Sequence, residues 1–232
     1  MNKATVKYAF LKSLPVMAGY TALGTGFGVL LSSKGYSFWW AILMSITIYA
    51  GSMQYVGVNL LAGGASVIST ALMTLMVNAR HIFYGISMID SYRDMGWRKW
   101  YAIFGLTDET YSIVCSDSDL PPGVNKKNYI FILSLMNQFY WIFGSFFGAF
   151  LGNTLSFNSM GIDFSMTALF VVIFVEQWEK NKQHLPAILG LAVSTVCLIV
   201  FGADNFLIPS MTGNVIGLFL LRNKMRKEGN CL

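Results

Sequence analysis

The chain has 232 residues, of which 55% are hydrophobic and only 12% are charged. Soluble domains carry about 25% charged residues, so this composition and a mean hydropathy of +0.55 exclude an ordinary soluble protein. The net charge is +5, and the basic residues lie in short clusters between apolar segments, a pattern typical of membrane topology signals rather than of nucleic-acid binding.

Seven apolar segments follow one another along the chain, with a weaker eighth between the third and the fourth. Several runs without a charged side chain exceed the ~20 residues that cross a bilayer. Barrel-like alternation is absent, so helices are the spanning structure. The sequence therefore predicts an all-α integral membrane protein with about six to seven transmembrane helices. The segments are 8–31, 37–61, 66–89, 129–151, 164–177, 185–203 and 206–221, and the weaker one is 100–115.

The weaker segment, "YAIFGLTDETYSIVC", is interrupted by Asp108 and Glu109. If all the basic clusters lie on the cytoplasmic side, this segment cannot cross the membrane. We therefore predict a re-entrant or interfacial element that lines protein or a watery cavity. The N-terminus would then lie outside, which the lysines near it oppose, and the sequence leaves this conflict open.

A weak internal repeat is visible in the apolar segments. "FGVLL" resembles "FGAFL", and "GYSFWWAIL" resembles "GIDFSMTAL". Residues 8–118 and 129–221 would be the halves of a single transporter domain, 1–232, and three helices per half would give the inverted repeat of secondary transporters. In that arrangement Arg80 overlays Asp204, and we expect these charges to meet near the midplane. Chance similarity between apolar stretches is the alternative.

The third segment contains "VNARHIFYG", in which Arg80 lies within a long apolar run. An arginine at the centre of a membrane helix costs about 2.5–3.5 kcal/mol, so it should face a partner or a watery cavity. Helical periodicity places Asn78, Arg80, His81 and Tyr84 on one side. We predict that Asn78, Arg80 and Tyr84 bind substrate and that His81, which titrates near neutral pH, relays protons.

The acidic pair Asp108 and Glu109 is the matching feature of the weaker segment. Together with Asp204, these carboxylates are predicted to couple transport to protons or to bind an ammonium group. The alternative is a structural role at a helix N-terminus, with Thr107 or Asp108 as the N-cap and Glu109 in the first turn. In a purely structural alternative, Arg80 locks two helices together through Asp204 or Glu109.

The first two segments supply further candidates. In "YAGSMQYVG", we predict that Tyr49, Gly51, Ser52 and Gln54 contribute to substrate binding, although helix packing alone could explain Gly51 and Ser52. In "PVMAGYTALGTGFG", Pro15 and several glycines are expected to break or thin the helix, exposing backbone groups that suit a zwitterion.

Catalytic and cofactor motifs are absent. The three cysteines are scattered, without the spacing of a metal site or a disulfide framework, so no metal or cofactor is predicted. Adjacent carboxylates on one helix point about 100° apart, which is poor geometry for a shared-proton dyad. The sequence therefore predicts a protein that is not an enzyme, with a membrane enzyme as the least favoured alternative.

Four stretches resemble, in order and spacing, the AzlC family, the large subunit of bacterial branched-chain amino acid exporters. They are "LPVMAGYTALGTGFGVLL", "MSITIYAGSMQYVGVNLLAGG", "VNARHIFYGIS" and "LTDETYSI", so the resemblance is strongest from about Leu14 to Ser112. The resemblance implies export of valine, leucine and isoleucine, and for some members methionine, across the bacterial inner membrane by a multi-pass protein. It also implies a small AzlD-type membrane partner.

On this basis we predict a secondary transporter driven by proton exchange. Arg80 would hold the substrate carboxylate as a two-pronged donor, and Asp108 or Glu109 would accept the ammonium group or a proton. A non-transporting scaffold or regulatory subunit of another carrier, or a transporter of a different small zwitterion, is the alternative. The family motif residues carried onto this chain are Tyr49, Gly51, Ser52, Gln54, Asn78, Arg80, His81, Asp108 and Glu109.

Overall fold

A computed structural model describes residues 2–117, 120–154, 184–202 and 206–228, together with isolated positions between 164 and 179. Helices, turns and bends make up these residues, and no strand occurs among them. The chain divides into two compact units, Met1–Thr167 and Ala168–Leu232, which are described separately.

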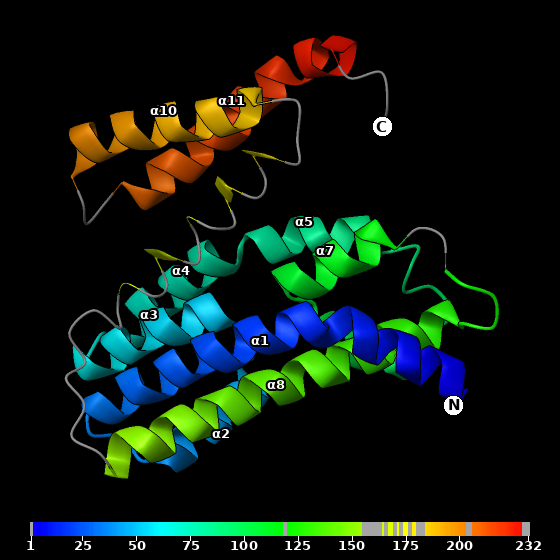
Figure 1. The fold of residues 1–232 in the computed structure, drawn as a ribbon. Coiled ribbons are helices and arrows are strands. Elements are labelled where there is room, and N and C mark those ends of the chain that lie inside the picture. Colours follow the sequence, from blue (N-terminus) through cyan, green and yellow to red (C-terminus); the bar gives the residue numbers. More distant parts are fainter. Residues whose placement is uncertain are drawn as a thin grey trace. The chain divides into compact units, whose positions relative to one another are not determined.

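Two long helices form the centre of the first unit. They are α1 (Lys3–Ser33) and α8 (Lys126–Thr154). The backbone N–H of Asn125 donates to Thr5 Oγ1 beside one end of the pair, and the Ser32 hydroxyl donates to Asn153 near the other. The helices therefore run side by side in the same direction (Figure 1). This corrects the predicted repeat, because "FGVLL" and "FGAFL" lie on parallel helices whereas an inverted pair would run in opposite directions.

The prediction that the first segment contains a broken helix is also wrong. The helix α1 is continuous, with Pro15 inside it. Its glycines instead allow close packing, since a Cβ atom at Gly28 would lie 2.2 Å from the backbone oxygen of Ser145 on α8. Small residues at such positions let membrane helices approach each other closely. Both α1 and α8 are long and apolar enough to cross a membrane, by length and composition.

The second predicted segment is a helical hairpin rather than one crossing helix. It contains α2 (Phe38–Thr47) and α3 (Gly51–Ala62). The Gln54 amide on α3 donates to the Ser45 hydroxyl on α2 at 3.2 Å, so the start of α3 lies beside the end of α2. Between them Tyr49 has a φ of 44°, in the left-handed region, where a right-handed helix cannot continue.

A second hairpin follows a broken helix. The third segment contains α4 (Val67–Asn78) and α5 (Arg80–Ser87), which are separated at Ala79, and the weaker segment contains α6 (Arg98–Phe104) and α7 (Asp108–Ser116). Along α8, Asn137 contacts Thr110 and Tyr129 contacts Asp117, so α7 runs opposite to α8. The helix α6 runs with α8, so α6 and α7 run in opposite directions along it.

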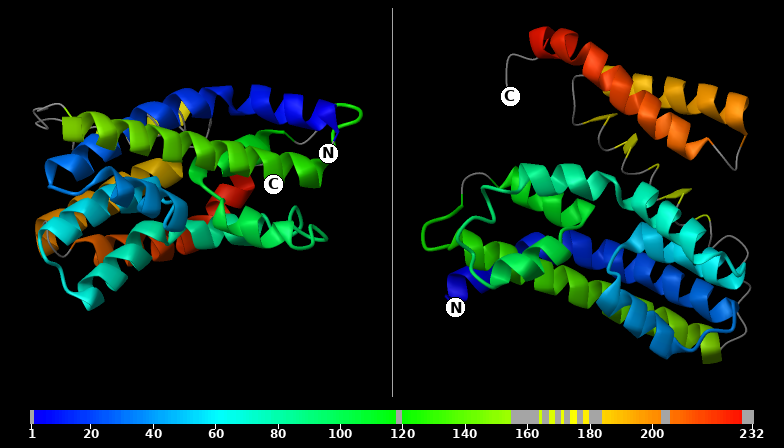
Figure 2. Two further views of the ribbon diagram at one scale, coloured as in Figure 1. Left: turned by 90° about the horizontal axis from the view of Figure 1, so that it is seen from below. Right: turned by 180° about the vertical axis from the view of Figure 1, so that it is seen from behind.

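The two hairpins approach each other from opposite ends of α8. The ring of Phe38 contacts Phe146 near one end, whereas Arg98 at the start of α6 bonds to Asn128 near the other. Their tips lie together, because the rings of Tyr49 and Phe104 are 6.1 Å apart. Figure 2 shows the ribbons of the first unit from two further sides. The amide of Gln138 on α8 also donates to the carbonyl of Ile46 beside the first tip, at 3.3 Å.

The second unit contains a pair of helices, α10 (Leu185–Phe201) and α11 (Leu207–Glu228). They touch through the hydroxyl groups of Ser194 and Ser210, which are 2.8 Å apart. Most of the predicted segment 164–177 falls outside the described residues.

Candidate functional site

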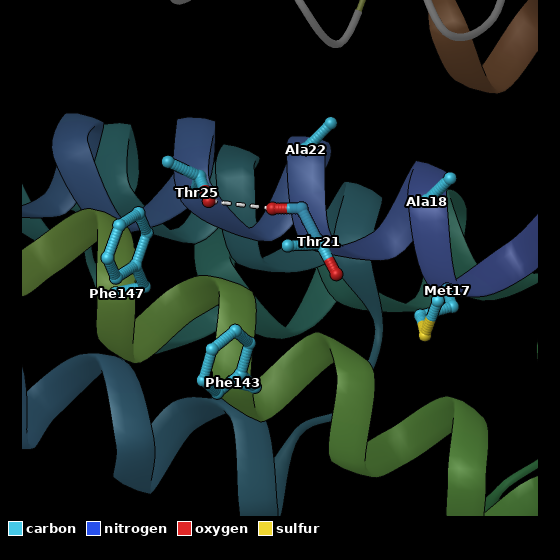
Figure 3. A pocket seen from close by; sticks show the side chains of 7 residues that line it. All are labelled: Met17, Ala18, Thr21, Ala22, Thr25, Phe143 and Phe147. Carbon is cyan, nitrogen blue, oxygen red and sulfur yellow. Dashed lines mark hydrogen bonds between the residues drawn. The ribbon is translucent and has the colours of Figure 1, made fainter.

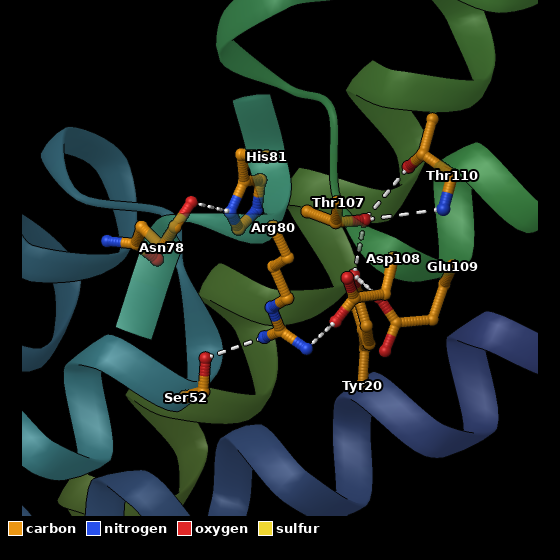
Figure 4. A network of polar contacts seen from close by, with 9 residues as sticks. All are labelled: Tyr20, Ser52, Asn78, Arg80, His81, Thr107, Asp108, Glu109 and Thr110. Atoms are coloured by element: carbon orange, nitrogen blue, oxygen red, sulfur yellow. Dashed lines mark hydrogen bonds and ion pairs between the residues drawn. The ribbon is translucent and has the colours of Figure 1, made fainter. Parts of the chain in front are cut away.

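Arg80 joins the tips of the two hairpins. It begins α5, and its guanidinium Nη1 lies 2.5 Å from the Asp108 carboxylate at the start of α7. Its Nη2 donates to the Ser52 hydroxyl, in the first turn of α3, at 2.8 Å (Figure 4). The N-terminal ends of α3, α5 and α7 therefore meet at one guanidinium, and each end carries partial positive charge.

The acidic pair lies in the first turn of α7, which Thr107 caps, so the capping interpretation is confirmed. Thr107 is the N-cap and accepts from the backbone N–H of Thr110 at 3.3 Å, with Asp108 and Glu109 in the first turn. Glu109 diverges from Asp108 and accepts from the Tyr20 hydroxyl at 2.6 Å. The same hydroxyl lies 2.7 Å from Thr107.

Arg80 has an acidic partner that differs from the two residues that the structural alternative named, Asp204 and Glu109. Its ion pair is with Asp108, whereas Glu109 bonds to Tyr20. The expected partner Asp204 lies outside the described residues. The ion pair links α5 to α7, so Arg80 does hold two helices together, as the structural alternative requires.

The predicted polar wedge of the third segment spans the junction between α4 and α5. The helix breaks at Ala79, and His81 Nδ1 lies 3.2 Å from the carbonyl oxygen of Asn78. The ring of Tyr84 stacks on Tyr111 of α7, with centroids 4.5 Å apart. The structure thus brings Arg80 to the hairpin tips, while His81 and Tyr84 lie beside them.

The motif residues of α3 also separate into two groups. Ser52 reaches Arg80, but the fully buried Gln54 accepts from the Trp141 indole N–H at 2.8 Å. Gly51 packs against the same indole, since a Cβ atom there would lie 2.9 Å from it. The Tyr49 hydroxyl is buried and has no hydrogen-bond partner in the described part of the chain.

Sequence reasoning missed Tyr20, Thr110, Asn137 and Trp141. Asn137 donates to Thr110 at 3.0 Å, which ties α8 to α7. Tyrosine and tryptophan are common in membrane helices, so neither marked a site. The Asn137 amide within an apolar helix was the one signal that could have been used.

An apolar groove of ≈ 580 Å³ lies along α1 and α8 (Figure 3). Small and aromatic side chains form it, and none belongs to the cluster around Arg80. They are Met17, Ala18, Thr21, Ala22, Thr25, Phe143 and Phe147.

Comparisons with known proteins identify the relatives of this chain. A family model described as "AzlC protein" matches residues 15–155. The "Branched-chain amino acid transport protein AzlC" of Bacillus subtilis is 43% identical over 232 residues, covering 98% of this chain and 91% of the relative. An "Uncharacterized membrane protein" of Haemophilus influenzae is 42% identical, covering 91% and 85%. "Inner membrane protein YgaZ" of Escherichia coli is 26% identical, covering 78% and 76%.

No solved structure is significantly similar to the chain. The apolar helices and the membrane-protein relatives define the class as an all-helical membrane protein. The chain belongs to the AzlC family.

Proposed function

We propose that this protein is a multi-pass secondary transporter that exports branched-chain amino acids across the bacterial inner membrane. The observation that carries the proposal is the Arg80 guanidinium, held by Ser52 and Asp108 where the two hairpin tips meet. A planar guanidinium among helix N-termini suits a carboxylate. The relative from Bacillus subtilis is named a branched-chain amino acid transport protein, which indicates the cargo.

The dimensions of the hairpins suit a site halfway across a bilayer. At 1.5 Å per residue, α2 and α3 span about 15–18 Å and the shorter α6 and α7 about 10–14 Å, so the two hairpins together span roughly the ~30 Å hydrocarbon core. Two hairpins that enter from opposite faces would therefore place their tips, and Arg80, near the midplane. Interrupted helices with a binding site at that depth are typical of secondary transporters.

We further propose that the whole chain, 1–232, forms one transporter domain that works with a small AzlD-type membrane subunit. Proton exchange drives export in this proposal, with the acidic residues of α7 near the cargo. The name of the relative from Escherichia coli, an inner membrane protein, supports the location.

The test is efflux of labelled leucine from cells preloaded with leucine-containing dipeptides. Cells that express this chain with its small subunit should export leucine faster than cells without it. Arg80→Lys should slow efflux about tenfold, because lysine keeps the charge but cannot form the two-pronged bond to a carboxylate.

Arg93→Lys is the matched control, because the Arg93 side chain is 70% exposed and pairs only locally with Asp90. This variant should export leucine at the unaltered rate. Efflux by Arg80→Lys that equals the control, with both proteins inserted in similar amounts, would overturn the carboxylate-binding role of Arg80. Equal efflux with and without the protein would overturn the transporter proposal.

A further inference from the structure

The Arg80–Asp108 ion pair already has the form of a complex between a guanidinium and a carboxylate. Asp108 Oδ2 lies 2.5 Å from Arg80 Nη1, with the side chains 21% and 30% exposed. The second oxygen of this carboxylate, Oδ1, is buried and accepts no hydrogen bond from the described residues. A buried acceptor without a donor is costly, so this oxygen is suited to a donor that arrives with the cargo.

Each hairpin presents one polar side chain to Arg80 from the first turn of its second helix. Both contain a related stretch, "WWAI" in α2 and "WYAI" in α6, and each following helix carries a tyrosine in its first two turns. Three residues before these tyrosines, Tyr55 and Tyr111, lie Ser52 and Asp108, the two residues bonded to Arg80. Asp108 therefore supplies a negative charge where the other hairpin has a neutral hydroxyl.

From this geometry we infer that the cargo enters by splitting the ion pair, a step that rests on the proposed transport function. The cargo carboxylate replaces Asp108 on the Arg80 guanidinium. The cargo ammonium group donates to the freed Asp108 carboxylate, including its Oδ1. The site remains neutral throughout, because one internal pair of charges is exchanged for two pairs with the zwitterion.

This mechanism defines the class of ligand that the site accepts. A monocarboxylate would pair with Arg80 but leave Asp108 as an unpaired charge, and an amine would leave Arg80 without its carboxylate. An uncompensated charge in such a partly buried place is strongly unfavourable. The unaltered protein should therefore select molecules that carry both charges and reject analogues that lack either one.

The experiment measures equilibrium binding to the full-length purified protein, with its small subunit, in lipid nanodiscs. Three ligands share one side chain: leucine, 4-methylpentanoate, which lacks the amino group, and isopentylamine, which lacks the carboxylate. The unaltered protein should bind leucine at least tenfold more tightly than either analogue. In Asp108→Asn the preference should invert, so that 4-methylpentanoate binds at least as tightly as leucine.

Ser52→Ala is the matched control, because it removes a hydrogen bond to Arg80 from the equivalent position without removing a charge. It should weaken all ligands but keep leucine preferred. If leucine binds the unaltered protein and Asp108→Asn still prefers it tenfold over 4-methylpentanoate, pair splitting is overturned and the transport proposal stands. If the unaltered protein does not bind leucine, the transport proposal itself fails. The comparison of the three ligands on the unaltered protein tests the inference even if Asp108→Asn does not fold.

Discussion

Gly148→Ala should prevent α1 and α8 from packing and abolish the folded first unit. A Cβ atom at this position would lie 2.0 Å from the backbone oxygen of Thr25 and 2.6 Å from its Cα atom. Both are backbone atoms, so a rotamer change on α1 cannot relieve the clash. Overpacking a core costs about 1–3 kcal/mol when side chains can adjust, and here the helices themselves must separate.

The measurement is the yield of monodisperse protein after detergent extraction, followed by its thermal unfolding. Gly148→Ala should give little or no folded protein. The matched control is Gly19→Ala, on α1, where an added Cβ atom meets nothing within 4 Å. This change should leave the unfolding temperature equal or slightly higher, since alanine favours a helix. If both variants unfold at the same temperature, the parallel packing of α1 and α8 is wrong.

Hydropathy predicted the helical class and most apolar segments but not their directions. The segment 37–61 is apolar throughout, and the same composition suits one crossing helix or two short ones that fold back. What distinguishes them is a single backbone angle, the positive φ of Tyr49, for which a tyrosine gives no sequence signal. The neighbouring β-branched residues "ITI" weaken the helix there but do not show which way the chain turns.

Glycines were misread for a related reason. A glycine can mark either a broken helix or a close contact between helices, and one sequence cannot separate these uses. Gly24 and Gly28 on α1, and Gly144 and Gly148 on α8, are each four residues apart and so lie on one face of their helices. This matched spacing favours helix packing, as the structure shows.

For the candidate site, the sequence identified the charged residues but not their pairing. Arg80, Asp108 and Glu109 were recognised because charges are costly in apolar segments. Neighbouring residues on one helix point about 100° apart, so only one carboxylate of the pair could face Arg80. Which one does so depends on the direction of α7, which sequence periodicity does not give.

Glu109→Gln should abolish uphill export of leucine but preserve leucine exchange. Asp108 is paired with Arg80, whereas Glu109 forms no ion pair among the described residues and bonds to the Tyr20 hydroxyl at 2.6 Å. A partly buried carboxylate without a cationic partner is suited to gain and lose a proton. Glutamine keeps the shape of the side chain and can bond to Tyr20, but it cannot take up or release a proton. The carrier without cargo would then be unable to complete its proton-coupled return step, so net export would stop.

The two activities are measured on the same vesicles. Uphill export is measured as the accumulation of labelled leucine inside the vesicles under an imposed pH gradient. This accumulation should fall to background in Glu109→Gln. Exchange is measured as uptake of labelled leucine into vesicles preloaded with unlabelled leucine, and it needs no net proton movement. Its rate should stay within about twofold of the unaltered rate, which corresponds to a difference in activation free energy under about 0.5 kcal/mol. Asp90→Asn is the control, because this carboxylate is 88% exposed, and it should retain both activities. Gradient-driven accumulation by Glu109→Gln would assign proton coupling to another group, because the variant has no titratable carboxyl at position 109.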